Sequence, residues 1–341
     1  MKRGFLNPKA QVRVIDLSPV SLLFVFSLFL ILFTAFLWYP SSCSFSHAVI
    51  PTFPELQEDS LVYRGEASTI PWSGWWWPFY DKSPPHLYDP GGPMDKYDRV
   101  SLARGQPNPG AMAWERKNHY TDKKEENWFG HCNGWAAAAV LEAKPRSSKE
   151  VAGIKFEIND IMGLLSEWHW WDAALAFYGS RYYGEGDNIH DIFPHEFHHL
   201  IINYIGEQGL PIIMDIRGGT IEKEDPQVWN YPAYRYQLAY RPDAEDKEKV
   251  HVHCRVWFSD FTLPSSLSQK TFTEDYYYWI KGDKRRPTSG QWETAREGGW
   301  GVSGDSRESH PDFLWYPQEA KGHPILNREQ YLEIVGQGEN R

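Results

Sequence analysis

A single cysteine, Cys132, stands where a glycine-flanked loop is expected to turn into a helix. Its surroundings read Gly130-His131-Cys132-Asn133-Gly134-Trp135, followed by four alanines. The alanines favour a helix, and the partial positive charge at a helix N-terminus favours the thiolate, the nucleophilic form of a thiol. Gly130 and Gly134 leave room for a substrate backbone, and the Cys132 amide can stabilise an oxyanion. The alternative is that Cys132 is a small buried apolar residue.

A thiol nucleophile needs a base, and the histidines form two groups that can supply one. The first group surrounds Asp191 and consists of His190, His195, His198 and His199. Residues three and four apart share a helix face. His251 and His253 lie two apart in a strand-like stretch, so they share a strand face. Since single histidines are usually structural, both groups stay open at this point.

Part of the first group also fits a zinc-peptidase pattern. The segment 195–199 reads His-Glu-x-x-His, with Glu196 as base and with Glu222 or Glu224 as a third ligand. Pro194 directly precedes it, so the motif would open its helix, whereas the pattern needs both histidines inside one. We therefore rank a zinc peptidase below a thiol enzyme and expect no metal among the site residues.

Composition excludes one class of partner and leaves another open. The 341 residues carry a formal net charge of -10 and show no basic stripe, which argues against nucleic acid. Aromatic residues are abundant, with 17 Trp, 19 Tyr and 18 Phe. We expect most of them to pack the interior. A non-catalytic surface protein whose Trp-rich loops hold a peptide or glycan is the alternative.

The N-terminal region predicts export. Val20–Tyr39 is a nearly uninterrupted apolar run that would span roughly 30 Å as a helix, the thickness of a bilayer core. Lys2, Arg3, Lys9 and Arg13 precede the run. This charge bias predicts a basic cytosolic tail over 1–19, a transmembrane anchor over 20–39 and an exported remainder. A signal peptide cleaved after Ala48 is the alternative.

The remaining chain reads as helices followed by antiparallel strands, an α+β fold. We expect helices over 132–143, from about 159, over 194–206 and near 328–335. Strands are expected over 210–216, 234–240, 250–258 and 272–280. These elements predict an irregular Trp- and Pro-rich region over 49–110, a catalytic core over 111–285 and a C-terminal extension over 286–341 that packs on the core.

Cysteine and acidic residues give little further guidance. Three cysteines, Cys43, Cys132 and Cys254, imply no disulfide framework. Acidic clusters at 222–225 and 243–246 read as solvated loops, with calcium binding as the alternative. We expect no required cofactor.

Two motifs resemble a known family. The Cys-Asn-Gly-Trp-Ala stretch at 132–136 and Val-Trp-Asn-Tyr-Pro at 228–232 are similar to the transglutaminase elicitor family, secreted enzymes of plant-pathogenic oomycetes with bacterial relatives. The family pattern has Gln where Tyr231 stands here, which puts any host-recognition role of that peptide in doubt. Weaker sequence similarities, including one at residues 310–315, extend the resemblance over most of residues 70–315.

The resemblance implies a core similar to papain-like cysteine proteases and a reaction that joins a glutamine side chain to a lysine amine. Its partners would be proteins bearing Gln and Lys, which either the membrane-anchored or the secreted form of this protein would meet. Cys132 carries over as the nucleophile, and Asn230 would lie near the thiol. The base does not carry over, because the strand that begins at 228 has no histidine. If water resolved the thioester instead, the same site would be a deamidase or cysteine peptidase.

We assign the remaining site residues as hypotheses. His198 with Asp215 is the expected base and orienting acid, and His253 with Asp260 is the reserve pair. The expected substrate contacts are the tryptophans Trp128, Trp135 and Trp229.

Overall fold

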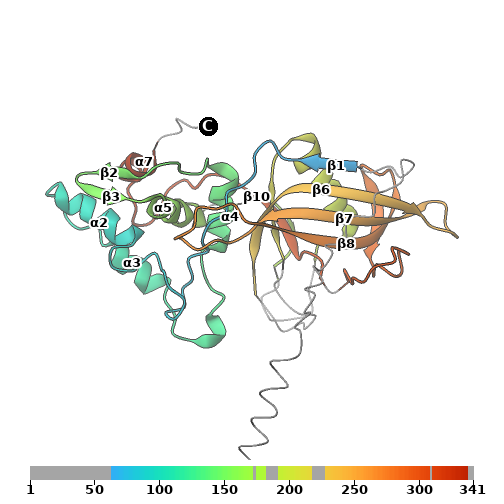
Figure 1. The fold of residues 1–341 in the computed structure, drawn as a ribbon, viewed down its shortest axis with the longest axis horizontal. Coiled ribbons are helices and arrows are strands. Elements are labelled where there is room, and N and C mark those ends of the chain that lie inside the picture. Colours follow the sequence, from blue (N-terminus) through green and yellow to red (C-terminus); the bar gives the residue numbers. More distant parts are fainter. Residues whose placement is uncertain (1–62, 172–173, 182–190, 217–226, 308, 337–341) are drawn as a thin grey trace, which may run out of the picture. The chain divides into compact units, whose positions relative to one another are not determined.

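Strands from widely separated parts of the sequence form one antiparallel sheet (Figure 1). The computed structural model describes residues 63–171, 174–181, 191–216, 227–307 and 309–336, all within one unit, Gln57–Arg341. Over these residues the sheet runs β4 (Ala174–Gly179), β10 (Phe313–Pro317), β5 (Ile212–Asp215), β6 (Asn230–Pro242), β7 (Lys249–Ser259), β8 (Thr271–Gly282) and β9 (Pro287–Trp292). β1 (Tyr63–Glu66) also pairs with β6. A separate hairpin joins β2 (Lys149–Val151) and β3 (Ile154–Phe156).

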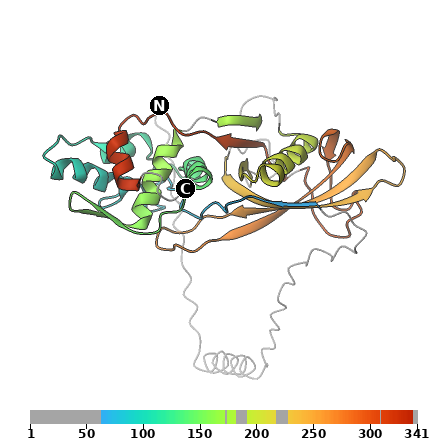
Figure 2. The ribbon, with the colours of Figure 1, turned by 90° about the horizontal axis from the view of Figure 1, so that it is seen from above.

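The helices fall into two places. Those of the first part of the unit are α2 (Pro93–Ala103), α3 (Ala111–Asn118), η1 (Lys124–Glu126), α4 (Cys132–Leu141) and α5 (Ile158–Trp170), joined by α7 (Arg328–Val335). Helix α6 (Pro194–Ile201) lies elsewhere. It continues into the π-helical turn η2 (Ile202–Glu207) and lies against one face of the sheet (Figure 2). Phe197 of α6 packs there on the rings of Tyr276 and Trp292. The helices and the antiparallel sheet confirm the α+β class.

The helix that follows Cys132 is buried on almost every side. Trp135 and the four alanines of α4 are buried, because α4 packs between α5 and the β6 region of the sheet. Small side chains let α5 approach closely. At Gly134 an added Cβ would overlap the carbonyl oxygen of Ser166 and lie 2.9 Å from the backbone nitrogen of Trp170. The sequence of α4 therefore serves helix packing.

Replacing Gly134 by alanine should lower the free energy of unfolding by about 3 kcal/mol, because the backbone of α5 must move to make room. Chemical denaturation measures the change. Gly322→Ala is the matched control, since a Cβ at Gly322 meets nothing within 4 Å. Equal stability of the two variants would contradict the close packing of α4 on α5.

Several expectations about chain organisation need revision. The region expected to be irregular contains α2 and β1. Residues 286–341 are more than an added layer, because β10 lies between β4 and β5 inside the sheet. The expected helices and strands within the core are present, with bounds that differ by a few residues. None of the helices in the described part combines the length and apolar character that a membrane crossing requires. The predicted anchor, Val20–Tyr39, lies outside the described residues.

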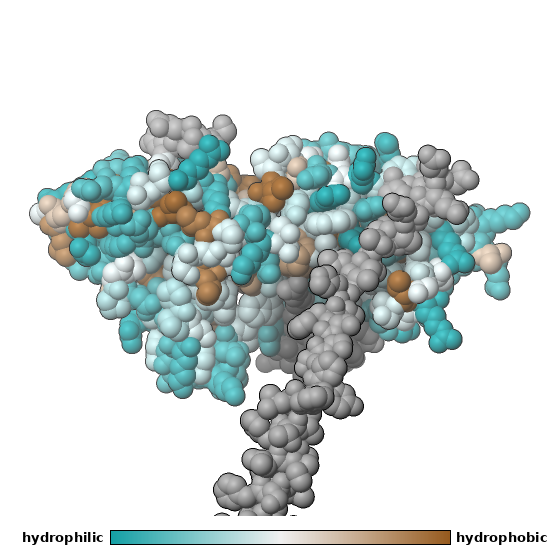
Figure 3. All heavy atoms as spheres, viewed as in Figure 1, coloured by the Kyte–Doolittle hydropathy of each residue, from teal (hydrophilic) through white to brown (hydrophobic). Residues whose placement is uncertain are grey.

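Many aromatic side chains of the described residues lie in the interior, and others are partly exposed. Among the buried tryptophans are Trp72, Trp77, Trp135 and Trp168. The face shown in Figure 3 is predominantly hydrophilic, and its apolar side chains occur in small separate groups. The abundance of aromatic residues is therefore largely a packing feature.

Candidate active site

Cys132 lies at the first position of α4, on the wall of a cavity of about 420 Å³. The thiol residue is 6 % exposed. Aromatic side chains form much of the cavity, contributed by Phe79, Trp128, Phe129, Trp170, Phe177, Phe313 and Trp315. Arg181 and Asn230 add polar groups to the lining. The cavity thus offers a narrow, largely apolar approach to one sulfur atom.

Asn230, the first residue of β6, faces the sulfur. Its side-chain Nδ2 donates to Cys132 Sγ at 3.6 Å, while its Oδ1 accepts a hydrogen bond from Trp315 Nε1 at 2.8 Å. Trp315 lies in β10, so the sheet order brings it beside Asn230. An indole N–H can only donate, and this fixes the amide so that its NH₂ group points toward the thiol. Trp315 was not among the predicted site residues.

Opposing effects act on the ionisation of Cys132. Burial is the largest and raises the pKa of the thiol, and the negative charge of Asp215 acts in the same direction. The backbone and side-chain N–H groups of Asn230 and the backbone N–H of Asn133 lower it. The Sγ also lies 3.6 Å from the carbonyl oxygen of Val228, which accepts the thiol proton. The resting form is therefore the thiol, and the surrounding N–H groups favour the thiolate once the proton leaves.

Asp215 is the acidic side chain that the fold brings to this region. It pairs with Asn230 across β5 and β6, and its Oδ1 accepts the backbone N–H of Trp229 at 2.6 Å. Its Oδ2 is buried without a hydrogen-bond partner in the described part of the chain. Burial, followed by the charge of Asp312, raises the pKa of Asp215 well above its usual range. The site therefore holds a carboxyl group that can keep a proton.

Neither predicted histidine lines this cavity. His198 is buried against the sheet, where its Nδ1 meets Tyr278 Oη at 2.8 Å and its Nε2 meets the Lys284 carbonyl at 2.8 Å. Burial lowers its pKa to about 4. Both ring nitrogens are thus engaged away from Cys132, and the structure does not bring His198 together with Asp215. Helical spacing identified a shared face but not the direction in which that face points.

The reserve pair is also separated. His253 Nε2 contacts Asp275 at 3.0 Å, and its ring stacks on Tyr277. Asp260 instead accepts the backbone N–H of Phe261. The partner of His253 is therefore Asp275 of β8, a diagonal neighbour that is paired with Arg255 in the β7–β8 register.

The expected substrate contact of Trp135 is wrong. Trp135 is fully buried, with its Nε1 bonded to the Trp72 carbonyl at 3.3 Å, so it packs the core. Gly130 and Gly134 make room for Trp76 and α5 respectively, since a Cβ at either would overlap them. Both glycines therefore allow close packing, and Gly130 also lines the cavity.

Of the other two tryptophans proposed as substrate contacts, one lies at the cavity. Trp128 lines it. Trp229 is half-buried beside it and packs on Trp76 and Phe261.

The alternative cation sites find little support. His199 Nδ1 meets the Arg285 carbonyl, and His195 stacks on Phe193. Glu222 and Glu224 lie outside the described residues. In the other acidic cluster, Asp243 is already bonded to Lys249 and His251. Cys254 is free and buried in β7.

Asp312, which precedes β10, gives the protein a measurable pH dependence. Burial, reinforced by Asp191, raises its pKa to about 6. The native state therefore binds this proton more tightly than the unfolded state, whose pKa is near 3.8. The stabilisation is complete below pH 4 and is lost as the pH rises through 6, a difference of about 3 kcal/mol.

Asp312→Asn should accordingly match the wild type at pH 4 and exceed its melting temperature at pH 7. Thermal unfolding across this range measures the difference. Asp305→Asn is the control of opposite sign, because the hydrogen bond from Arg307 lowers the pKa of Asp305. A constant offset between wild type and Asp312→Asn at all pH values would refute the assignment.

Comparisons with known proteins agree with the motifs. Residues 106–269 match the family model described as Transglutaminase elicitor. The chain is similar in structure to the GP42 transglutaminase from Phytophthora sojae, with 20% sequence identity and a TM-score of 0.59, over 80% of this chain and 90% of that chain. At this identity the likeness concerns the fold. No curated protein matches. The predicted family resemblance is confirmed.

Proposed function

Since residues 106–269 belong to the transglutaminase elicitor family, we propose that this chain is a protein-glutamine γ-glutamyltransferase. It would join a glutamine side chain to a lysine amine through a thioester on Cys132 and release ammonia. The similar Phytophthora sojae protein is named a transglutaminase, and we extend that activity to this chain here. The core would follow the papain-like division, in which a helix carrying the thiol faces a sheet carrying its polar partners.

One observation carries this proposal: Cys132 opens a helix inside an aromatic cavity, with its sulfur facing an amide that Trp315 holds in place. Helix N-terminus and amide donors both favour negative charge at the reacting atoms. The thiolate attacks the carboxamide carbon, and the Cys132 backbone N–H and Asn230 Nδ2 stabilise the oxyanion. Expulsion of ammonia leaves the acyl group on sulfur.

We assign the proton transfers to Asp215 in place of His198. Burial raises the proton affinity of its carboxylate, the negative charge of its ionised form acts on the Cys132 thiol, and its Oδ2 has no hydrogen-bond partner in the described structure. In its ionised form Asp215 takes the thiol proton and delivers it to the leaving nitrogen. In the second half of the reaction, Asp215 takes a proton from the lysine amine as the amine displaces sulfur from the acyl carbon. The isopeptide bond forms and the thiolate returns.

The aromatic lining favours transfer over hydrolysis. A lysine amine must outcompete concentrated water for the thioester, which requires that water be excluded from the reacting carbon. The rings of Trp128, Phe129, Phe177 and Phe313 provide such a lining. A deamidase or peptidase would use the same thioester with water as acceptor.

The products of one assay test the proposal. A glutamine-bearing protein is incubated with the enzyme and a labelled primary amine, and incorporated amine, free ammonia and cleaved peptide are measured together. We expect incorporation with one ammonia released for each amine bound. Ammonia or cleavage without incorporation would identify a hydrolase. No product of any kind would leave a non-catalytic binding protein and overturn the proposal.

We also propose that the enzyme works outside the cytosol on proteins bearing Gln and Lys. The support is the apolar run Val20–Tyr39 with its preceding basic residues. N-terminal sequencing of the mature protein separates the two export routes. An intact N-terminus in the membrane fraction indicates the anchor, and a start at Val49 indicates cleavage after Ala48. A mature protein with an intact N-terminus in the cytosol would contradict both.

A further inference from the structure

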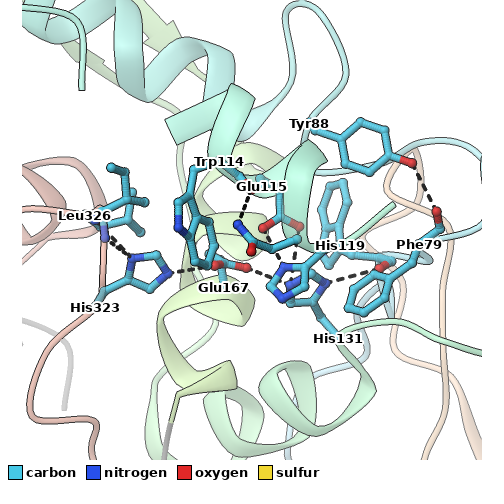
Figure 4. Close-up of polar contacts among 12 residues, drawn as sticks. Phe79, Tyr88, Trp114, Glu115, His119, His131, Glu167, His323 and Leu326 are labelled. Carbon is cyan, nitrogen blue, oxygen red and sulfur yellow. Dashed lines mark hydrogen bonds and ion pairs between the residues drawn. The ribbon is translucent and has the colours of Figure 1, made fainter. Parts of the chain in front are cut away.

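Two carboxylates and two imidazoles meet in the interior (Figure 4), and one of the imidazoles belongs to His131, the residue before Cys132. They belong to Glu115, His119, His131 and Glu167, whose ligand atoms all lie within 4.8 Å of one another. Glu115 lies in α3, and His119 follows that helix. His131 directly precedes α4, and Glu167 lies in α5. The cluster therefore joins three helices at the base of Cys132.

The charges of the cluster are unbalanced. Glu115 and Glu167 are 1 % and 0 % exposed. Two buried carboxylates so close together require a positive charge between them or a shared proton.

The contacts leave ligand atoms directed at one another. His131 Nε2 lies 2.6 Å from Glu167 Oε2 and 3.5 Å from Glu115 Oε1. Despite this proximity, His131 Nε2 and Glu167 Oε2 are buried without a hydrogen-bond partner in the described residues. His119 Nδ1 lies 2.7 Å from Glu115 Oε2. That second pair is hydrogen-bonded, whereas the lone pairs of His131 Nε2 and Glu167 Oε2 converge without a hydrogen bond in the described residues, and a metal ion can use them.

The outer contacts suit metal binding. His131 Nδ1 lies 3.2 Å from the Trp77 carbonyl. A carbonyl only accepts, so it fixes the proton on Nδ1 and leaves the Nε2 lone pair facing the cluster. His323 Nε2 meets Glu167 Oε1 at 2.6 Å and orients that carboxylate. The ring of Phe79 stacks on His119 at 4.7 Å, and Trp170 packs on the same imidazole. The cluster is thus held from outside and enclosed by aromatic rings.

We propose that Glu115, His119, His131 and Glu167 bind one divalent metal ion, with zinc as the ion their chemistry fits best. Zinc takes tetrahedral sets of nitrogen and oxygen ligands at about 2.0–2.1 Å, which places the ligand atoms about 3.3 Å apart. The separations in the cluster lie on both sides of this value, so small side-chain rotations suffice. With four protein ligands the site is closed to substrate and structural. It would fix His131, and with it the start of α4, beneath Cys132.

Metal content of the purified full chain tests the proposal. The protein is prepared without chelators and measured by inductively coupled plasma mass spectrometry. We expect about one zinc ion per chain in the wild type, since a closed four-ligand site retains its metal. Cys132→Ala should keep the zinc, which separates this site from the proposed reaction. Glu115→Gln should lose at least about 80 % of it, whereas the exposed neighbour Glu125→Gln should not.

The melting temperature of the wild-type protein gives a second readout, which does not require any variant to fold. Wild-type protein stripped by dipicolinate should melt at a lower temperature, and zinc but not magnesium should restore the original value. Metal-free wild type whose melting temperature does not respond to added zinc would overturn the proposal, and the cluster would then be an ion-pair network sharing a proton. Zinc that survives Glu115→Gln but is lost in His195→Gln would place the metal at the peptidase-like motif and also overturn it.

Discussion

Cys132→Ala should lower amine incorporation by about 10³-fold or more, because no other group in the cavity can form the acyl intermediate. The side chain is small and lines the cavity at the start of α4, so its removal leaves α4 packed as before. Initial rates with a saturating amine and a glutamine-bearing protein measure the loss. The acyl-enzyme itself, detected by mass spectrometry after brief mixing without amine, should be absent from the variant.

The chain supplies its own matched control. Cys254 is the other cysteine of the described residues, buried in β7 and absent from the cavity lining. Cys254→Ala should retain activity near the wild-type level. Residual activity above a tenth in Cys132→Ala, or comparable loss in both variants, would remove Cys132 from the nucleophile's role.

Asn230→Ala should lower kcat by about 10²-fold with little change in KM, because its amide stabilises charge that develops only as the reaction proceeds. The variant loses the Nδ2 donor at 3.6 Å from the sulfur. It also leaves Trp315 Nε1 without its acceptor, which adds a cost in stability. Steady-state kinetics and thermal unfolding separate these two effects.

Trp315→Phe tests whether the orientation of that amide matters. The substitution keeps a ring in the cavity wall and removes the N–H that holds Asn230. We expect a decrease in kcat of about tenfold, since Asn230 remains present but less directed. If Trp315→Phe were fully active while Asn230→Ala was not, the hydrogen bond would be structural and Asn230 would act without it. A rise in KM alone in Asn230→Ala would contradict its assignment to the transition state.

Local signals in the sequence predicted the parts of the fold that depend on neighbouring residues. The alanine run marked α4 and placed Cys132 at its start, and Pro194 marked the start of α6, because both effects act within one helical turn. The strands of the core were recognisable from runs of β-branched and aromatic residues. The resemblance to the family was visible in two short motifs.

Asp215 was predicted as an orienting acid, but its proposed role in proton transfer could not be predicted in the same way. The histidine groups were recognised from spacing, yet the fold directs His198 toward Tyr278 and His253 toward Asp275. Which face of a helix or strand meets the nucleophile depends on the order of strands, and spacing does not contain that order. Asp215 reaches the region only because β5 pairs with β6.

The buried cluster also escaped sequence reasoning for a physical reason. Its members come from α3 and the residue after it, from the residue before α4 and from α5, so their separations along the chain match no ligand motif. The spacing of Glu115 and His119 by one helical turn was the single local hint. The five-residue zinc-peptidase pattern was the more conspicuous signal and points to side chains with other contacts.

The place of β10 in the chain decides when the candidate site can be completed during synthesis. This strand follows every other strand of the sheet in the sequence, yet it inserts between β4 and β5 and delivers Trp315 to Asn230. A chain that has not been synthesised past residue 317 therefore lacks the strand between β4 and β5 and the indole that directs the amide. Under the proposed function, cross-linking would begin only after that point.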